Sequence, residues 1–259
     1  MKALVLSAGK GERLMPLTAT VPKPIVEVGG RPLIHYPLKM LARAGVTEVV
    51  INVHHLAAAV QNALGSGGSI GIRITYAPEA ALLGTGGPLI GLREFFGNET
   101  FAILNCDTII DLDLHALAEF HRRCGGLATL VLRESDSPQA YSRIEIDANS
   151  RVRRMRLLKR RAPLEFDDYS PPRDASAAAR LDAYMYCGVL LCEPSVFDLM
   201  PAILPPFSLM GDLFAPLLAR GLPMYAYVHR GFVRTVDNLK SLEALRAEFA
   251  ARPPCLPFL

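Results

Sequence analysis

Short apolar runs alternate with helix-length segments through the first half of this 259-residue chain, and this alternation constrains its fold more than any other feature. The runs have the length of buried strands, and the segments between them carry apolar residues at helical spacing and close at glycines such as Gly45 and Gly65. The predicted strands are residues 2–7, 47–53, 72–78 and 101–106, and the predicted helices are residues 31–45, 56–65, 86–96 and 114–125. Strands joined by helices form parallel sheets covered on both faces. We therefore expect the α/β class, as a Rossmann-like three-layer αβα sandwich with a mixed, mainly parallel sheet.

The pattern changes after Gly126. Strand-like runs then follow one another without an intervening helix, which predicts a small antiparallel addition to the sheet. Residues 160–179 are polar, rich in proline and small residues and without a period, so we expect a long loop there. The later predicted elements are strands 127–134, 142–147, 152–158, 183–192 and 223–229 and helices 194–201, 209–221 and 238–252. We expect a single domain over residues 1–259, with halves at 1–126 and 127–259.

The composition argues against several classes of protein. A formal net charge of +3 is too mild for a nucleic-acid-binding protein, which usually shows a strongly basic face. No apolar run reaches the roughly 18 residues of a transmembrane helix, and no signal-peptide pattern precedes the first strand. The cysteines lie far apart and form no CxxC pair, which gives little support to a disulfide framework or a closed zinc site. They are Cys106, Cys124, Cys187, Cys192 and Cys255. We expect a cytoplasmic protein with no membrane and no nucleic-acid partner.

Residues 7–30, SAGKGERLMPLTATVPKPIVEVGG, form a loop-like run rich in glycine and proline directly after the first strand. Glycines between a strand and a helix let backbone N–H groups approach an anion, and phosphate is the expected guest. Two known phosphate-binding loops do not fit. Walker A needs GxxxxGK followed by Ser or Thr, and the dinucleotide fingerprint needs glycine where Leu14 stands. Taken alone, a G-x-G pair is equally compatible with a tight turn.

Two cations favour the phosphate interpretation over a surface loop with solvated charges. Arg13 offers a planar fork of donors, and Lys23 offers a compact charge. Pro22 and Pro24 flank Lys23 and stiffen the backbone through their fixed φ angles. A stiff cationic loop of this kind suits a phosphate chain held in one geometry.

The segment LSAGKGERLMPLTATVPKPIVEVGGRPLI resembles the signature loop of the sugar-1-phosphate nucleotidylyltransferases, L-x-A-G-x-G-x-R-L-x-P-L-T followed by P-K-P. The resemblance continues through VVINVHHLAAAV, YAPEAALLGTGGPL, FAILNCDTIIDLDL, GVLLCEP and FSLMGDLFAPLLARG, so it covers nearly the whole chain. In its LLGTGG sequence and its lack of a C-terminal left-handed helix domain, the chain resembles short bacterial mannose- or heptose-1-phosphate guanylyltransferases and a related N-acetylmuramic acid 1-phosphate uridylyltransferase.

The resemblance implies in-line attack of a sugar 1-phosphate oxygen on the α-phosphorus of a nucleoside triphosphate, with release of pyrophosphate and with Mg²⁺ as cofactor. Two anions must meet, so the protein's task is positioning and charge neutralisation. The implied catalytic residues are Arg13 at the leaving pyrophosphate, Lys23 between the two phosphates, and Asp107 as a metal ligand at a strand end. The implied nucleotide-binding residues are Leu6, Ala8, Gly9, Gly11, Glu79, Gly84 and Thr85, with Glu79 at the nucleobase. Residues 1–126 would then bind the nucleotide, and residues 127–259 the sugar phosphate.

The second metal ligand follows less directly from the resemblance. The family takes it from a late W-x-D-I-G-T-P motif, where this chain has GFVRTVDNLKSL. Strict alignment places Thr235 at the ligand position, whereas the cytidylyltransferase-type variant F-W-x-x-M-D-T-L makes Asp237 the ligand, and we predict Asp237. The alternative is that Asp237 only caps the helix that starts near Asn238. The family also has glycine where Cys106 stands, and cysteine is small enough to fit without a chemical role.

The sugar end departs from the family pattern at several positions. The implied sugar-phosphate-binding residues are Lys159, Gly188 and Ser142. Ser142 stands where the family has glycine, Leu158 replaces a family glutamate, and Tyr186 replaces a family asparagine. The alternative for Lys159 is that it belongs to a solvated basic run over residues 151–161.

Two functional alternatives remain beside the main expectation. We expect a monomer or homodimer that joins a nucleotide to a sugar 1-phosphate for cell-surface polysaccharide. GTP is mildly favoured, because a carboxylate such as that of Glu79 can accept hydrogen bonds from guanine N1–H and N2–H₂. One alternative is uridylyl or cytidylyl transfer to another sugar phosphate or to a non-sugar phosphate. The other is a catalytically impaired nucleotide-sensing or scaffold protein, suggested by the altered late motif and the missing glutamate.

Overall fold

The computed structural model describes residues 1–134, 142–158, 163–167 and 181–259, and these residues fall into two compact units. Unit 1 comprises Met1–Leu83, Glu99–Ala116 and Gly231–Leu259, and unit 2 comprises Gly84–Asn98 and Leu117–Arg230. This division differs from the halves expected on either side of residue 126. The last segment of the chain belongs to the unit that contains the first, and a short segment from the first half belongs to unit 2.

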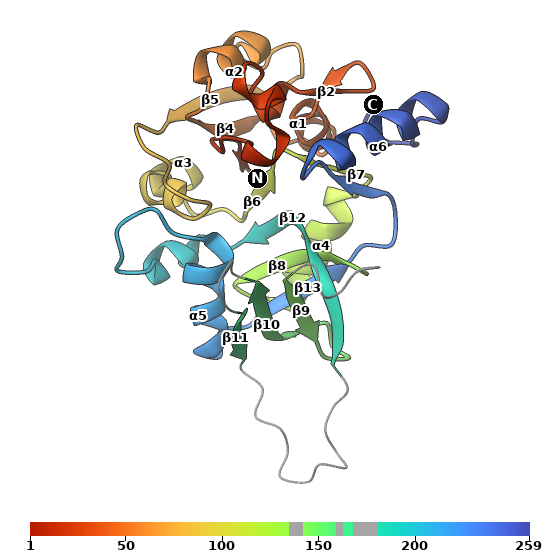
Figure 1. Cartoon of the computed structure of the whole chain (residues 1–259). Helices are drawn as coiled ribbons and strands as arrows, with labels where there is room; N and C mark the ends of the chain where they lie inside the picture. Colours follow the sequence, from red (N-terminus) through yellow and green to blue (C-terminus); the bar gives the residue numbers. More distant parts are fainter. Residues whose placement is uncertain (135–141, 159–162, 168–180) are drawn as a thin grey trace. The chain divides into compact units, whose positions relative to one another are not determined.

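Unit 1 contains a parallel sheet with the strand order β6-β1-β4-β5 (Figure 1). Its strands are β1 (Ala3–Leu6), β4 (Glu48–Val53), β5 (Arg73–Pro78) and β6 (Phe101–Asn105). In the register of β1, Ala3 pairs with Val49 on one side and Ala102 on the other. The continuous apolar run of β1 is explained by its burial, because a central parallel strand is covered on both faces. The predicted α/β alternation is confirmed for this unit.

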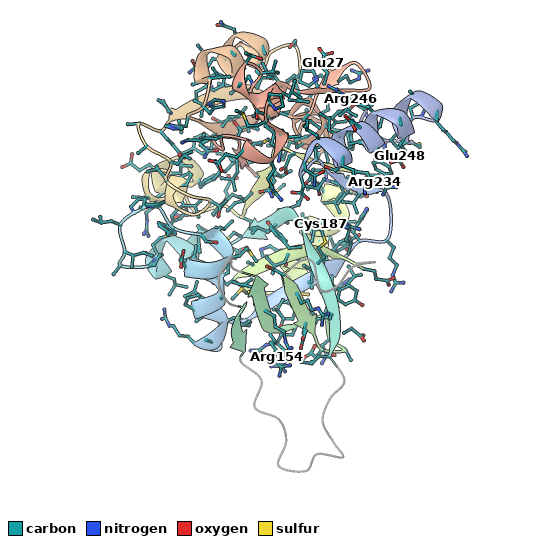
Figure 2. All side chains as sticks on the ribbon, in the orientation of Figure 1. Glu27, Arg154, Cys187, Arg234, Arg246 and Glu248 are labelled. Atoms are coloured by element: carbon teal, nitrogen blue, oxygen red, sulfur yellow. The ribbon has the colours of Figure 1, made fainter. Side chains whose placement is uncertain are left out.

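The helices of unit 1 are α1 (His35–Arg43), α2 (Ala57–Leu64) and α6 (Leu239–Ala251), and a short hairpin pairs β2 (Glu27–Val28) with β3 (Arg31–Pro32). Apolar residues from the N-terminal loop, α1 and α6 form one buried cluster. Within it, the rings of Tyr36 and Phe249 meet edge to face with centroids 5.8 Å apart. Two polar contacts hold α6, between residues that Figure 2 labels: Arg246 donates to the Glu27 carbonyl at 2.9 Å, and Glu248 pairs with Arg234. The C-terminal helix is therefore held to the N-terminal loop.

A short antiparallel ribbon of unit 1 was not expected from the sequence. It pairs β7 (Thr108–Ile110) with β14 (Val233–Thr235), with Thr108 opposite Thr235. Both strands have only three residues, which is too short for an alternating pattern to stand out. The ribbon matters because it joins the segment after β6 to the segment before α6.

Unit 2 contains a mixed sheet with the strand order β11-β10-β9-β12-β8-β13. The strands are β8 (Ala128–Arg133), β9 (Arg143–Ile146), β10 (Val152–Leu158), β11 (Pro163–Asp167), β12 (Asp182–Cys192) and β13 (Met224–Val228). The β8–β13 pair is parallel and the other pairs are antiparallel, as the predicted antiparallel addition requires. Strand β11 corrects one expectation, since it lies inside the segment 160–179 predicted as a loop. Residues 159–162 and 168–180 lie outside the described residues.

Several predicted α-helices of unit 2 are shorter or tighter than expected. Helix α4 (Leu114–Cys124), which begins in unit 1, follows the prediction. The segment 86–96 forms a 3-10 helix (Gly87–Gly91) and a single turn, α3 (Arg93–Phe96). The segment 194–201 is a 3-10 helix (Pro194–Leu199), and the segment 209–221 is a π-helix (Leu209–Phe214) followed by α5 (Ala215–Ala219). Glycine and proline in these short segments lower the intrinsic preference for an α-helix. No helix in the described part of the chain combines the length and the apolar character needed to cross a bilayer.

Candidate active site

The segment after β1 that contains Gly9 and Gly11, called the glycine loop below, has a backbone conformation that requires glycine at one position. Gly11 has a φ of 66°, and a Cβ added there would lie 2.9 Å from Cγ2 of Thr18 and 3.3 Å from Cβ of Lys23. A Cβ at Gly9 would meet nothing within 4 Å. Gly11 is therefore required by the fold of the loop itself, whereas Gly9 leaves open space for a ligand to approach the backbone.

Thr18 and His55 hold this loop in place. Thr18 is fully buried, and its hydroxyl donates to the Gly11 carbonyl at 2.9 Å. His55 donates from Nε2 to the Thr18 carbonyl at 2.8 Å, which assigns the proton to that nitrogen. The loop that follows β4 thus supports the loop that follows β1.

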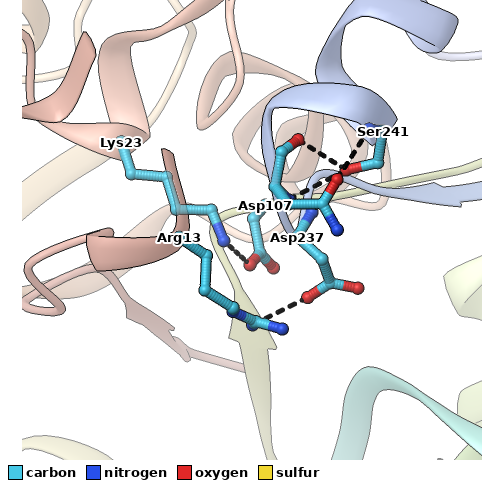
Figure 3. Close-up of polar contacts among 6 residues, drawn as sticks. Arg13, Lys23, Asp107, Asp237 and Ser241 are labelled. Carbon is cyan, nitrogen blue, oxygen red and sulfur yellow. Dashed lines mark hydrogen bonds and ion pairs between the residues drawn. The ribbon is translucent and has the colours of Figure 1, made fainter. Parts of the chain in front are cut away.

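Lys23 and Asp107 form an ion pair at the end of β6 (Figure 3). Their side chains are only 13% and 16% exposed, so each charge depends on its partner. Oδ2 of Asp107 accepts from Lys23, while Oδ1 is buried and has no hydrogen-bond partner among the described residues. An unsatisfied buried carboxylate oxygen is costly and suits a cation that the protein itself does not supply.

The β7–β14 ribbon brings Asp237 to the same place. The Val236 N–H donates to the Asp107 carbonyl at 3.1 Å, one residue before Asp237. Arg13 then donates to Oδ1 of Asp237 at 2.9 Å, and Figure 3 shows both ion pairs side by side. The predicted residues Arg13, Lys23, Asp107 and Asp237 therefore meet within unit 1, although Arg13 and Asp237 are 224 positions apart in the sequence.

Asp237 is not the cap of the last helix. Asn238 is the N-cap of α6, and its side chain accepts from the Ser241 N–H at 2.9 Å in a capping box. The Asp237 N–H donates to the Ser241 hydroxyl, which leaves its carboxylate pointing to Arg13. The capping alternative considered for Asp237 is therefore wrong. Thr235 pairs within the ribbon, opposite Thr108.

The donor set fits a magnesium ion that takes only part of its ligands from the protein. Asp107 and Asp237 offer carboxylate oxygens, and the described residues contain no group of three or more His, Cys, Asp or Glu side chains that could hold a metal ion. Mg²⁺ commonly uses one or two carboxylates and completes its shell with water and substrate phosphates. Two carboxylates, one of them with an orphaned buried oxygen, match that requirement.

Cys106 lies directly before Asp107 and is buried. Burial, together with the neighbouring Asp107 charge, raises the pKa of the Cys106 thiol to about 12. The thiol therefore stays protonated at neutral pH, and a thiol is neither a nucleophile nor a metal ligand of consequence. Cys106 fills the position as a small side chain, as expected.

The Glu79 carboxylate is engaged by the protein itself. Glu79 is buried, its Oε1 accepts from Nδ2 of Asn52 at 2.8 Å, and its Oε2 accepts from the Leu83 N–H at 2.9 Å. A nucleobase contact of Glu79 stays a prediction. Asn52 was not singled out from the sequence, although a polar amide at the end of the apolar strand VVINV is a recognisable signal.

The GTGG segment of unit 2, residues 84–87, packs against the backbone of residues 207–209. Gly84 has a φ of 78°, and a Cβ there would lie 2.3 Å from the Phe207 carbonyl oxygen. The Thr85 hydroxyl accepts from the Leu209 N–H at 2.8 Å. Gly84 and Thr85 thus have structural partners, and their nucleotide contacts stay predictions.

The remaining predicted residues are distributed over both units. In unit 1, Leu6 ends β1 and Ala8 is buried in the glycine loop. In unit 2, Gly188 has a φ of 76° inside β12, where the pairing with β8 shifts register. Ser142 directly precedes β9, and Lys159 lies outside the described residues. The sugar-phosphate roles of these residues stay predictions.

Comparison with known proteins gives a consistent result. Residues 2–156 match the family model described as nucleotidyl transferase. The chain is 34% identical to a mannose-1-phosphate guanyltransferase of Debaryomyces hansenii over 93% of its length and 62% of the relative's. It is 31% identical to a UTP–glucose-1-phosphate uridylyltransferase of Synechocystis sp. over 87% of its length and 57% of the relative's. The chain thus spans about three fifths of the length of these relatives.

A solved structure supports the fold. It comes from Bacillus anthracis, is provisionally described as a glucose-1-phosphate thymidylyltransferase in complex with a sucrose, and superposes with a TM-score of 0.75. The match covers 98% of this chain and 96% of the other at 22% identity. This likeness confirms the mixed-sheet α/β architecture.

Proposed function

The chain belongs to the nucleotidyl transferase family, and on this premise we propose that it transfers a nucleoside monophosphate from a nucleoside triphosphate to a sugar 1-phosphate and releases pyrophosphate. One observation carries the proposal. Arg13, Lys23, Asp107 and Asp237 converge at the end of β6, beside a glycine loop with open backbone. Two cations and two carboxylates at one strand end can neutralise two phosphate-bearing reactants.

Each residue of the site has a separate proposed role that follows from its position. The open backbone at Gly9 would receive the triphosphate, and Arg13 would act as a bidentate donor for the leaving pyrophosphate. Lys23 is paired with Asp107, and it would lie between the incoming phosphate and the α-phosphate. Holding both anions in contact replaces a bimolecular encounter by a positioned one, which is the main contribution expected of such a site.

Asp107 and Asp237 would hold Mg²⁺ when the nucleotide binds. The ion would neutralise charge on the phosphate oxygens during transfer. The buried Oδ1 of Asp107 supports this assignment, because a bound cation would satisfy it. Asp237 can release Arg13 to the triphosphate when the ion binds, and that release is cheap because Arg13 is 67% exposed and exposed ion pairs contribute little.

We propose GTP as the nucleotide. The support is the guanyltransferase name of relatives 34% identical to the chain. UTP is the second candidate, because a uridylyltransferase is 31% identical. Transfer to a non-sugar phosphate and a nucleotide-sensing role without turnover remain the alternatives. The sensing alternative loses support because Asp237 is present at the site that the altered motif had put in doubt.

We place the activity in the cytoplasm, in the supply of activated sugars for cell-surface polysaccharide, with the chain acting as a monomer or homodimer. The free cysteines of the chain agree with a reducing compartment.

Pyrophosphate release, measured with each of the four common nucleoside triphosphates and a panel of sugar 1-phosphates, tests the proposal. We expect release with one nucleotide–sugar pair, dependent on Mg²⁺ and lowered at least about a hundredfold by Asp107→Asn. Asp198→Asn is the matched control, since Asp198 pairs with Arg93 on the surface of unit 2. No release with any pair, together with tight nucleotide binding, would favour the sensing alternative.

A further inference from the structure

A chain of buried hydrogen bonds in unit 1 connects the loops that follow β1, β4 and β5. The Ser7 N–H donates to Oδ1 of Asn52 at 2.8 Å, and the Ser7 hydroxyl donates to the Asn52 carbonyl at 2.9 Å. Nδ2 of Asn52 donates to Oε1 of Glu79 at 2.8 Å, and Oε2 of Glu79 accepts from the Leu83 N–H at 2.9 Å. Ser7, Asn52 and Glu79 are all buried, so water does not substitute for these bonds.

The donors and acceptors of this chain fit in only one order. Both ends, Ser7 and Leu83, present backbone N–H donors. A side-chain amide has one oxygen acceptor and one NH₂ donor. The Asn52 oxygen accepts from the Ser7 N–H, so its NH₂ group faces the next residue, Glu79. The neighbour then faces one donor from each side and must be a pure acceptor. A carboxylate meets that requirement and an amide does not, which gives Glu79 a role inside the protein.

We propose that Asn52 and Glu79 are a positioning pair for the nucleotide site, which fixes the entry of the glycine loop at Ser7 and the segment ending at Leu83. This inference rests on the proposed function. Ser7 directly precedes Ala8 and Gly9, so a shift of its N–H moves the open backbone that receives the triphosphate. Misplaced by even about 1 Å, such groups lose much of their contribution.

Each single substitution leaves one unsatisfied contact. Glu79→Gln introduces an amide, whose NH₂ group must face either Asn52 or Leu83, both of which are donors. Reversing the Asn52 amide only moves the conflict to Ser7. Asn52→Asp places a second carboxylate against Glu79 with no proton between the oxygens. Both variants keep the size and shape of the side chains.

The double variant Asn52→Asp/Glu79→Gln restores every bond with the order reversed. The introduced aspartate accepts from the Ser7 N–H and from the NH₂ of the introduced glutamine. The glutamine oxygen then accepts from the Leu83 N–H. The net charge of the pair is unchanged, so the double variant tests hydrogen-bond polarity and not charge. Asn62→Asp/Glu94→Gln is the matched control, because both of those residues are exposed.

The main measurement is kcat/KM for the nucleotide that gives turnover, beside the same ratio for the other nucleotides. We expect each single variant to lower kcat/KM about 10- to 100-fold, the cost of one unsatisfied buried group. We expect the double variant to recover to within about threefold of the wild-type value. The preference among nucleotides should stay the same in all variants.

A pH profile separates the two single variants. In Asn52→Asp the two carboxylates can share one proton, so its activity should rise relative to wild type as the pH falls. Glu79→Gln has no such proton to gain, and its defect should not depend on pH. His54, which donates from Nδ1 to the Glu79 carbonyl at 2.8 Å, is the titratable group next to the pair. Because His54 is present in both variants, the difference between their profiles isolates the carboxylate pair.

Three results would overturn the inference. The first is a changed nucleotide preference in Glu79→Gln that the double variant does not rescue, as expected if Glu79 contacts the base. The second is full activity per folded molecule in the single variants despite a lower melting temperature, which would make the pair purely structural. The third is a double variant as defective as the singles.

Failure of the proposed function is recognised separately. Affinity for inorganic tripolyphosphate, measured by calorimetry, reports the glycine loop without turnover. Wild type could bind tripolyphosphate and still release no pyrophosphate. In that case, weaker tripolyphosphate affinity in both single variants with recovery in the double variant supports the positioning pair, and unchanged affinity in the single variants overturns it. If wild type does not bind tripolyphosphate, both the proposed function and this inference are overturned.

Discussion

At the residue level, Lys23 and Asp107 are the most constrained pair in the site. They are 84 positions apart, largely buried and bonded to each other, so neither charge faces water alone. Lys23→Ala removes the cation that the proposed function places nearest to both reacting phosphates. We expect turnover to fall by about two orders of magnitude or more in a pyrophosphate-release assay.

Two further variants make the Lys23 result interpretable. Lys240→Ala is the control, since Lys240 is exposed on α6, and it should leave turnover unchanged. Lys23→Arg keeps the charge next to Asp107 and guards against a loss that reflects misfolding, because an unpaired buried carboxylate destabilises a protein. Wild-type turnover in folded Lys23→Ala would contradict the role of this lysine.

Arg13 and Asp237 offer a test of exchange between ion-pair partners. If Arg13 leaves Asp237 for the triphosphate, then Asp237→Asn frees Arg13 beforehand. Tripolyphosphate affinity in EDTA should rise about two- to fivefold, in keeping with the small contribution of an exposed pair, and affinity in Mg²⁺ should fall. Calorimetry in both buffers, with Asp198→Asn as the matched variant, measures the two changes. Equal affinities of wild type and Asp237→Asn in EDTA would contradict the exchange.

Cys106 allows a prediction with a definite pH direction. Its pKa is raised by burial to about 12, so the reactive thiolate forms only as the pH rises towards that value. Alkylation of the native protein at about pH 8 should label the exposed Cys255 and leave Cys106 unmodified. Mass spectrometry of the digested protein measures both, and the denatured protein should be labelled at both positions. Rapid labelling of native Cys106 at that pH would show that the thiol is accessible and ionised.

At the level of elements, α6 depends on its capping box. Asn238→Ala removes the acceptor for the Ser241 N–H and should lower the free energy of unfolding by about 1 kcal/mol, measured by urea denaturation. Asn238→Gly is the comparison, because glycine at an N-cap costs only a few tenths of a kcal/mol. Equal losses in both variants would show that the cap contributes nothing beyond backbone conformation.

The central strands and most helices of unit 1 could be predicted from the sequence because burial on both faces leaves a continuous apolar run, as in β1 and β4. The ribbon of β7 and β14 could not, since a three-residue strand carries no period. The predicted α-helix over residues 86–96 became a 3-10 helix and one turn, because Gly87, Pro88 and Gly91 outweigh the apolar spacing.

A site residue could be predicted where its position in the sequence matches one position of a family motif without ambiguity. Arg13 and Lys23 lie in unbroken motifs and Asp107 in a motif with one substitution at Cys106, whereas Asp237 required a choice between two registers of a degenerate motif. Asn52 was missed because its importance depends on which loops the fold brings to it, and one sequence does not show that. The partners of the Glu79 carboxylate within the protein could not be predicted for the same reason, and its nucleobase contact stays a prediction.

At the level of the whole molecule, unit 1 is built from three separate stretches of chain. Its last stretch, Gly231–Leu259, contributes β14, α6 and part of the buried cluster around Tyr36. A chain ending at Arg230 should therefore expose that cluster and lose cooperative unfolding of unit 1, measured by circular dichroism on heating. Phe249→Ala should give a milder loss of about 3–5 kcal/mol, as for other large-to-small core substitutions. A shortened chain that melts like wild type would contradict this account of the unit.

The β7–β14 ribbon also has a consequence for the chain during its synthesis. The glycine loop, Lys23 and Asp107 are synthesised before the stretch Leu117–Arg230 of unit 2, whereas Asp237 is synthesised after it. The nascent protein therefore has a lysine–aspartate pair without the second carboxylate. The four side chains of the candidate site can therefore assemble only after the segment Gly231–Leu259 has been synthesised.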